Sequence, residues 1–175
     1  MPDFIVKICL LGDGGVGKTS LVYRFIENRF SRDFKSTLGV NLLKKKIKLE
    51  DGKDVSVQLW DLGGQEAYKK LRKLYLEGSQ GALIVFDVLA QKSFDNLEDW
   101  VQSFIQIRGA NMPMLLIANK IDLADRRVVT RAQAEAYAEK YGMDLIETSA
   151  ATGENVEKAF TDLIRKIVDG LPSNE

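Results

Sequence analysis

Residues 12–19, Gly-Asp-Gly-Gly-Val-Gly-Lys-Thr, have the spacing of a phosphate-binding loop. Their glycines let the backbone turn its N–H groups inward around an anion, whereas a Cβ would obstruct that turn. Lys18 can reach the β- and γ-phosphates of a nucleotide, and the Thr19 hydroxyl can ligate Mg²⁺. A glycine-rich turn that binds nothing is the alternative, but an apolar run precedes the loop and a helical pattern follows it. The residues predicted to bind nucleotide here are Asp13, Gly14, Gly15, Val16, Gly17, Lys18, Thr19 and Ser20.

A second set of candidate residues begins at Asp61, directly after an apolar run. A carboxylate at the end of a strand near a phosphate loop can hold Mg²⁺, usually through water. Gly64 would let a backbone N–H approach the γ-phosphate, and Gln65 could orient an attacking water. On its own, Asp-x-x-Gly is a weak signal, because a turn after a strand explains it equally well. Its position after a phosphate loop favours the catalytic interpretation.

Two later segments indicate which base is bound. Asn119-Lys120-Ile121-Asp122 and Glu147-Thr148-Ser149-Ala150 each follow an apolar run. The Asp122 carboxylate can accept hydrogen bonds from both N1–H and the N2 amino group of guanine, and adenine offers no such pair. Asn119 can join the two segments, the Lys120 stem can cover a ring face, and a backbone N–H near Ala150 can meet guanine O6. A capped turn before a helix is the alternative for the first segment. The candidate base-binding residues are Asn119, Lys120, Asp122, Ser149 and Ala150.

Composition narrows the chemistry further. The chain has 175 residues, enough for one domain, with 25 basic and 25 acidic residues, one cysteine and no histidine. The charge balance gives no sign of a nucleic-acid partner. Without histidine, oxygen ligands and Mg²⁺ are the expected metal chemistry, and the single Cys9 is expected to be a buried apolar residue. We also expect a cytoplasmic protein, because no apolar run reaches the roughly 20 residues that span a bilayer.

The apolar pattern alternates between strands and helices. Strands are predicted at 4–11, 40–50, 55–60, 82–88, 114–118 and 143–146, and helices after the phosphate loop and at 93–107, 130–141 and 155–168. Ser93 and Thr130 are candidate N-caps. The alternation predicts an α/β fold, a six-stranded, mostly parallel sheet with about five helices on both faces and its ligand at the carboxyl ends of the strands. Asp51-Gly52 predicts a hairpin, which makes one edge strand antiparallel.

Two segments are rich in lysine and could be either solvated surfaces or sites for an acidic partner. Along 40–50, Lys44, Lys46 and Lys48 alternate with other residues, as on a protected edge strand. Around Leu71 and Leu74, the basic residues predict a solvated amphipathic helix. These basic residues are Lys69, Lys70, Arg72 and Lys73.

Taken together, the motifs resemble the five ordered guanine-nucleotide motifs of the Ras superfamily, and the resemblance covers nearly the whole chain. The 36–40 segment, the Trp60-Asp61 junction and the 75–78 segment are most similar to Rab-type GTPases. Leu62-Gly63 departs from the Thr-Ala usual there and resembles the Arf form. The resemblance implies a P-loop G domain over residues 1–170 with a short tail at 171–175.

The resemblance also implies roles for residues outside the phosphate and base motifs. Thr37 would ligate Mg²⁺ and help Gln65 to place the attacking water, and Phe34 would close over the phosphates. Phe30 would lie against the guanine, with packing beneath a loop as the alternative. Effectors, a GTPase-activating protein and an exchange factor would bind the stretch from Leu38 to Leu42, Trp60 and the region up to Tyr75. Leu42 stands where an aromatic residue is usual. A monomer is expected, and we expect no membrane association to be encoded in this chain; the alternative is peripheral membrane association through a lipidated tail that has been removed.

The sequence therefore predicts a switch in signalling or membrane traffic that binds GTP or GDP with Mg²⁺ and hydrolyses GTP slowly. The predicted catalytic residues are Lys18, Thr37, Gly64 and Gln65, and the predicted metal ligands are Thr19, Thr37 and Asp61. Two alternatives remain at this point: a module that binds guanine nucleotide without cycling, and a P-loop kinase or ATPase. Gln65 disfavours the first and Asp122 the second.

Overall fold

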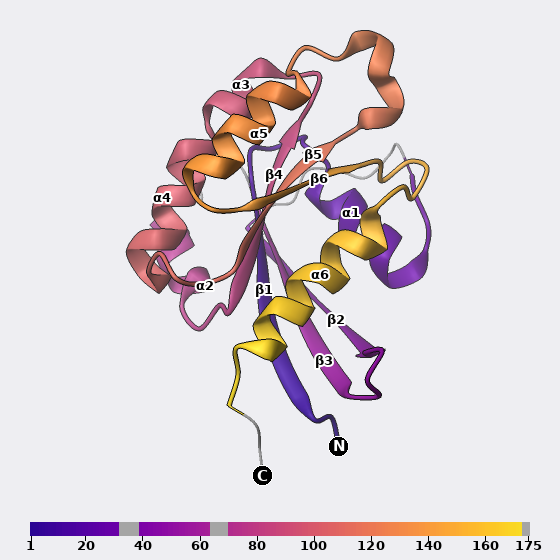
Figure 1. Cartoon of the computed structure of the whole chain (residues 1–175), viewed down its shortest axis with the longest axis vertical. Helices are drawn as coiled ribbons and strands as arrows, with labels where there is room; N and C mark the ends of the chain where they lie inside the picture. Colours follow the sequence, from indigo (N-terminus) through magenta and orange to yellow (C-terminus); the bar gives the residue numbers. More distant parts are fainter. Residues whose placement is uncertain (32–38, 64–69, 173–175) are drawn as a thin grey trace.

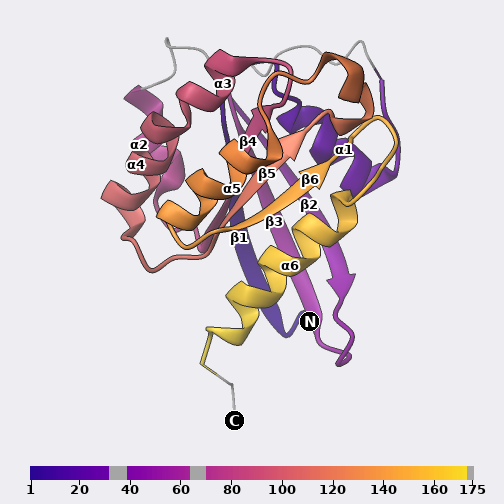
Figure 2. The ribbon, with the colours of Figure 1, turned by 45° about the horizontal axis from the view of Figure 1, so that its top comes forward.

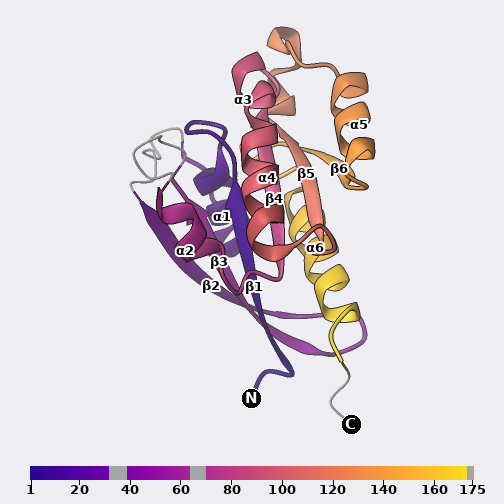
Figure 3. The ribbon, with the colours of Figure 1, turned by 90° about the vertical axis from the view of Figure 1, so that its left-hand side faces the viewer.

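A six-stranded sheet forms the centre of the molecule, in a computed structural model that describes residues 1–31, 39–63 and 70–172. Its strand order is β2-β3-β1-β4-β5-β6, and only the β2–β3 pair is antiparallel. The carboxyl ends of the parallel strands lie together, at the end of the molecule opposite both termini (Figures 1 and 3). The strands are β1 Phe4–Leu11, β2 Val40–Lys48, β3 Asp54–Leu62, β4 Gly81–Asp87, β5 Met114–Asn119 and β6 Asp144–Thr148.

Helices cover both faces of the sheet (Figure 2). On one face α1 and α6 pack over a core that includes Val22, Phe25 and Phe160, and on the other α4 and α5 pack over a core that includes Trp100 and Phe104. The predicted α/β fold and its antiparallel edge strand are confirmed. The α-helices described are α1 Lys18–Glu27, α2 Arg72–Leu76, α3 Gln91–Asp95, α4 Leu97–Arg108, α5 Arg131–Lys140 and α6 Val156–Asp169, and a 3₁₀ helix spans Ile121–Arg126.

One helix predicted as continuous, at 93–107, is instead two. Asn96 separates α3 from α4 with φ −81° and ψ −4°, a ψ too far from the helical value to continue a regular helix. Ser93 is not an N-cap: its hydroxyl lies inside α3, where it accepts from the Asp87 N–H at 3.0 Å and donates to the Ala90 carbonyl at 2.7 Å. The prediction for Thr130 is correct, because its hydroxyl accepts from the Gln133 N–H in a capping box.

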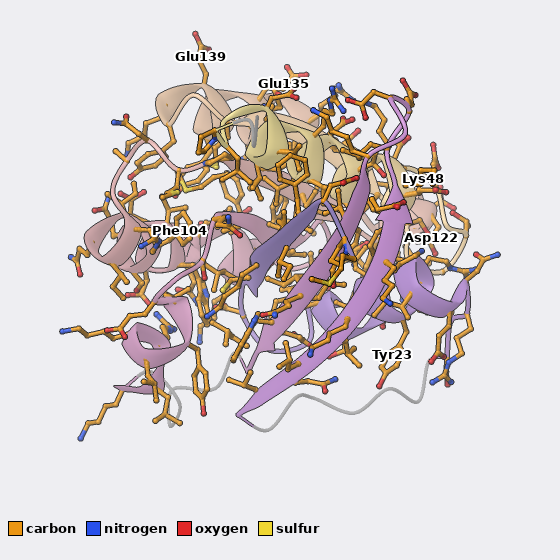
Figure 4. All side chains as sticks on the ribbon, turned by 90° about the horizontal axis from the view of Figure 1, so that it is seen from below. Tyr23, Lys48, Phe104, Asp122, Glu135 and Glu139 are labelled. Carbon is orange, nitrogen blue, oxygen red and sulfur yellow. The ribbon has the colours of Figure 1, made fainter. Side chains whose placement is uncertain are left out.

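The two lysine-rich segments differ from one another. On β2, Lys44, Lys46 and Lys48 are exposed, as predicted, and Figure 4 shows Lys48 on this edge strand. On α2 the amphipathic prediction is wrong: the aliphatic Leu74 is 62% exposed and the cationic Arg72 is 7% exposed. The Arg72 guanidinium stacks on Trp100, 3.5 Å from the ring centroid, and pairs with Asp99 at 2.6 Å. α4 therefore supplies partners that make burial of this charge possible.

Candidate functional site

The loop between β1 and α1 has a backbone that requires glycine at two positions. Gly12 has φ +148°, and a Cβ there would lie 2.2 Å from the Val85 carbonyl oxygen on β4. Gly17 caps α1 with φ +100°, and a Cβ there would lie 2.4 Å from Asn119 Nδ2. The loop therefore packs directly against β4 and β5, with Gly14 and Gly15 exposed to solvent. Such a cradle at a helix N-terminus suits a phosphate chain.

Lys18 lies under this loop, with 5% of its surface exposed. Its ammonium donates to the carbonyl oxygens of Gly12 at 2.6 Å and Asp13 at 3.0 Å, so the loop curls around the charge. Burial lowers the pKa of Lys18 to about 8, against the opposing effects of Asp61 and Asp13. A phosphate anion in the cradle would compensate this desolvated charge.

Thr19 and Asp61, the two described residues that are predicted to ligate the metal, meet beside the loop. The Thr19 hydroxyl donates to Asp61 Oδ2 at 2.5 Å, and Asp61 is 1% exposed at the end of β3. Within the ranges described, no three acidic, cysteine or histidine side chains are grouped to hold a metal. A hydroxyl and one carboxylate fit Mg²⁺, which keeps several waters and takes substrate phosphate oxygens as further ligands.

The Asp13 side chain contacts the α3–α4 junction, a contact that the sequence did not reveal. Its carboxylate accepts from Asn96 Nδ2 at 2.6 Å and from the Trp100 indole N–H at 2.9 Å. Trp100 is buried and also carries Arg72 on its ring. The phosphate loop is thereby fixed to α4, and α4 in turn to α2.

Asn119 joins the two base-side segments, as predicted, and it also contacts the phosphate loop, which was not predicted. At the end of β5 it is 1% exposed; its Nδ2 donates to the Val16 carbonyl at 2.9 Å, and its Oδ1 accepts from the Thr148 hydroxyl at 3.0 Å. The neighbouring Lys120, at φ +73°, donates to the Gly15 carbonyl at 2.9 Å and pairs with Asp87 at 2.8 Å. Its stem therefore runs from the base segment back to the phosphate loop.

Asp122 and the 149–154 turn meet on the side of the site where the base is expected to bind. The buried Ser149 hydroxyl donates to Asp122 Oδ1 at 2.8 Å, and Asp122, labelled in Figure 4, is exposed on the 3₁₀ helix. Ala150 is 4% exposed. Arg24 reaches the same turn from α1 and was missed in the sequence, because a helical arginine carries no signal of a contact 126 residues away.

The other predicted residues divide into two groups. Ser20 lies in the first turn of α1, half-buried, and Phe30 packs against the core beneath α1 and α6, which agrees with the packing alternative. Leu42 pairs with Trp60 across β2 and β3, and the Trp60 ring lies 6.0 Å from that of Tyr75, so these three share one surface. Four predicted residues lie outside the described part of the chain: Phe34, Thr37, Gly64 and Gln65. Leu38, at the start of the expected partner stretch, lies outside it too.

Comparison with known proteins gives similarity over the whole site. The sequence model of the Ras family matches residues 7–169. Human Ras-related protein Rab-8B is 38% identical over 169 residues, 97% of this chain and 81% of that protein. Ras-related protein Rab-1 of Theileria parva is 41% identical over 176 residues, which cover 98% of this chain and 80% of that protein. Ras-related protein YPTC6 of Chlamydomonas reinhardtii is 40% identical over 165 residues, which cover 94% of this chain and 76% of that protein. The matched region contains the phosphate loop and both base-side segments.

Proposed function

Because the chain belongs to the Ras family and is a guanine-nucleotide-binding GTPase of the Rab-like branch, we propose that residues 1–170 form one G domain that cycles between GTP and GDP with Mg²⁺. The observation that carries this proposal is the double hydrogen bonding of Asn119, which ties the phosphate loop to the segment before the 149–154 turn. One rigid edge can thus hold both ends of a nucleotide.

Each described site residue has a distinct task in this proposal. Lys18 and the loop N–H groups neutralise the β- and γ-phosphates as charge develops during phosphoryl transfer. Asp122 accepts from the guanine N1–H and N2 amino groups, and the Ser149 hydroxyl holds its carboxylate in place. Lys120 covers one face of the ring with its stem.

The metal and the attacking water complete the proposed site. Thr19 and Asp61 would hold Mg²⁺, Asp61 through water, and the ion would supply positive charge that stabilises the phosphates during transfer. Thr37, Gly64 and Gln65, outside the described residues, are proposed to hold the γ-phosphate and to place the water, and Phe34 is proposed to close over the phosphates. We expect slow hydrolysis by the protein alone, since Phe34 occupies the position of an internal catalytic arginine.

Partners of the switch are proposed to bind the surface formed by Leu42, Trp60 and Tyr75. These side chains come from β2, β3 and α2, next to the segments that would respond to the γ-phosphate. Effectors, a GTPase-activating protein and an exchange factor would meet this surface, in signalling or membrane traffic.

No helix in the described residues has the length and hydropathy to cross a membrane. We propose a cytoplasmic monomer.

The test is nucleotide identification by HPLC, followed by a single turnover after loading with GTP and Mg²⁺. Guanine nucleotide and slow decay of GTP are expected, with Gln65→Leu stalling the decay because no side chain then orients the water. Asp122→Asn should lose at least tenfold of its preference for GDP over ADP, since an amide cannot accept from both guanine donors. Asp125→Asn, the same change on the same 3₁₀ helix, is the matched control. GTP that stays bound without decaying would point to a binding module, and bound ADP would overturn the role of Asp122.

A further inference from the structure

Arg24 connects the helix behind the phosphate loop to the turn beside the base. It lies in the last turns of α1, and its guanidinium donates through Nε to the Ala150 carbonyl at 2.8 Å and through Nη2 to the Ala151 carbonyl at 2.6 Å. Its Nη1 also donates to Asn28 Oδ1 at 3.2 Å, where α1 ends. The fork geometry of arginine is suited to binding two neighbouring carbonyls at once.

The turn that Arg24 binds has few side-chain anchors of its own. Ala150, Ala151 and Gly153 carry at most a methyl group, and the stem of Arg24 lies beside Gly153, with Cδ 3.6 Å from where a Cβ would be. Within the turn, the Gly153 N–H donates to the Ser149 carbonyl at 2.8 Å. The Ala150 methyl belongs to the buried core, and hydrogen bonds hold the rest of the turn's backbone.

These bonds fix the direction of the N–H groups in the turn. A peptide unit is planar and trans, so holding its carbonyl also aims the N–H on its other side. The Gly153 bond to Ser149 orients the N–H of Ala150, and the Arg24 bond to Ala150 orients the N–H of Ala151. Both peptide planes that flank Ala150 are thus set, one by the turn itself and one by α1.

We propose that Arg24 is a positioning residue for guanine recognition, which holds the turn so that its N–H groups face O6 of the base. The inference rests on the proposed function, because it names how that site keeps its selectivity. Arg24 touches the turn and not the ligand, so its effect passes through the backbone of Ala150 and Ala151. α1 thus carries Lys18, which binds phosphate, at its start and Arg24, which orients the base-side turn, near its end.

The experiment measures dissociation constants of GDP and 6-thio-GDP by displacement of a fluorescent nucleotide. Sulfur at position 6 accepts hydrogen bonds poorly, so the analogue has already lost most of the contact that Arg24 supports. Arg24→Ala should weaken GDP by roughly 10- to 100-fold, the scale of one or two lost N–H···O6 hydrogen bonds, and 6-thio-GDP by about 3-fold or less. Arg24→Lys keeps the charge but not the fork, and should show the same selective loss at smaller size.

Arg165→Ala is the matched control, because it removes an exposed arginine of α6 whose ion pairs, with Asp51 in the β2–β3 turn and Asp169 on α6, involve none of the site residues. It should leave both constants unchanged. Equal losses for GDP and 6-thio-GDP would make Arg24 a general support of the fold and overturn the inference, as would an unchanged GDP constant in Arg24→Ala. If Arg24→Ala does not fold, the Arg24→Lys ratio decides. A wild-type protein that binds no guanine nucleotide would refute the proposed function itself, which the variants cannot do.

Discussion

Replacing Gly17 by alanine should destabilise the protein by two separable effects. The residue has φ +100°, so a Cβ costs about 1–2 kcal/mol in a left-handed conformation. That Cβ would also lie 2.4 Å from Asn119 Nδ2, and overpacking of this kind costs typically ~1–3 kcal/mol. The expected loss in the free energy of unfolding is the sum, about 2–5 kcal/mol, or roughly 4–20 °C in Tm for a domain of this size.

The matched control is Gly52→Ala in the β2–β3 turn. Gly52 has φ +87° and no heavy atom within 4 Å of an added Cβ, so only the backbone strain of about 1–2 kcal/mol applies. Urea unfolding of each variant, stripped of nucleotide and Mg²⁺ with EDTA, measures both losses. Loss of binding alone cannot explain a difference under these conditions.

A double-mutant cycle isolates the clash. Asn119→Ala removes the side chain that an alanine at position 17 would strike, so in that background Gly17→Ala should cost no more than Gly52→Ala does. The reasoning fails if Gly17→Ala destabilises no more than Gly52→Ala in the wild-type background, or if its cost is the same with and without the Asn119 side chain. Either result would mean that the phosphate loop does not pack against β5 as described.

Two further predictions concern buried groups around the site. Trp100→Phe keeps an aromatic ring under Arg72 but removes the hydrogen-bond donor to Asp13, and should lower the free energy of unfolding by about 1–3 kcal/mol. The control is Trp60→Phe, because the indole N–H of Trp60 has no hydrogen-bond partner among the described residues. It should lower the free energy of unfolding by less in the same urea titration. Burial raises the pKa of Cys9 from 9.0 to about 11, so the unfolded chain releases its proton first and stability should fall as pH rises from about 9 to about 11, by about 3 kcal/mol. Cys9→Ala should remove that part of the pH dependence, and identical profiles would contradict the burial argument.

Local patterns predicted most of the fold because local physics determines it. The apolar run of β1 and the stripe of α6 follow from period and length, and the Thr130 capping box from two nearby residues. The break at Asn96 could not be predicted, since the carboxamide that marks it is engaged by Asp13, 83 residues away. Burial of Arg72 was hidden for the same reason, because its partners lie on α4.

The candidate site shows the same division. Residue types at fixed spacing identified the phosphate loop and the base-side segments, because each motif lies within one segment of the chain. The contacts that connect these segments were visible only where chemistry suggested them, as for Asn119. The contacts of the Asp13 side chain with Asn96 and Trp100 were not predicted, and neither was the contact of Arg24 with the base-side turn.

These connections also suggest why a nucleotide should stabilise the molecule as a unit. The phosphate loop and α1 together contact each surrounding part: β5 through Asn119, α4 through Asp13, and the base-side turn through Arg24. A ligand that binds only when all of these are in place adds RT ln(1 + [L]/Kd) to the free energy of unfolding, about 4 kcal/mol at a thousandfold excess over Kd. A variant that weakens one connection, such as Arg24→Lys, should therefore lower the free energy of unfolding by more when nucleotide is bound than when it is absent.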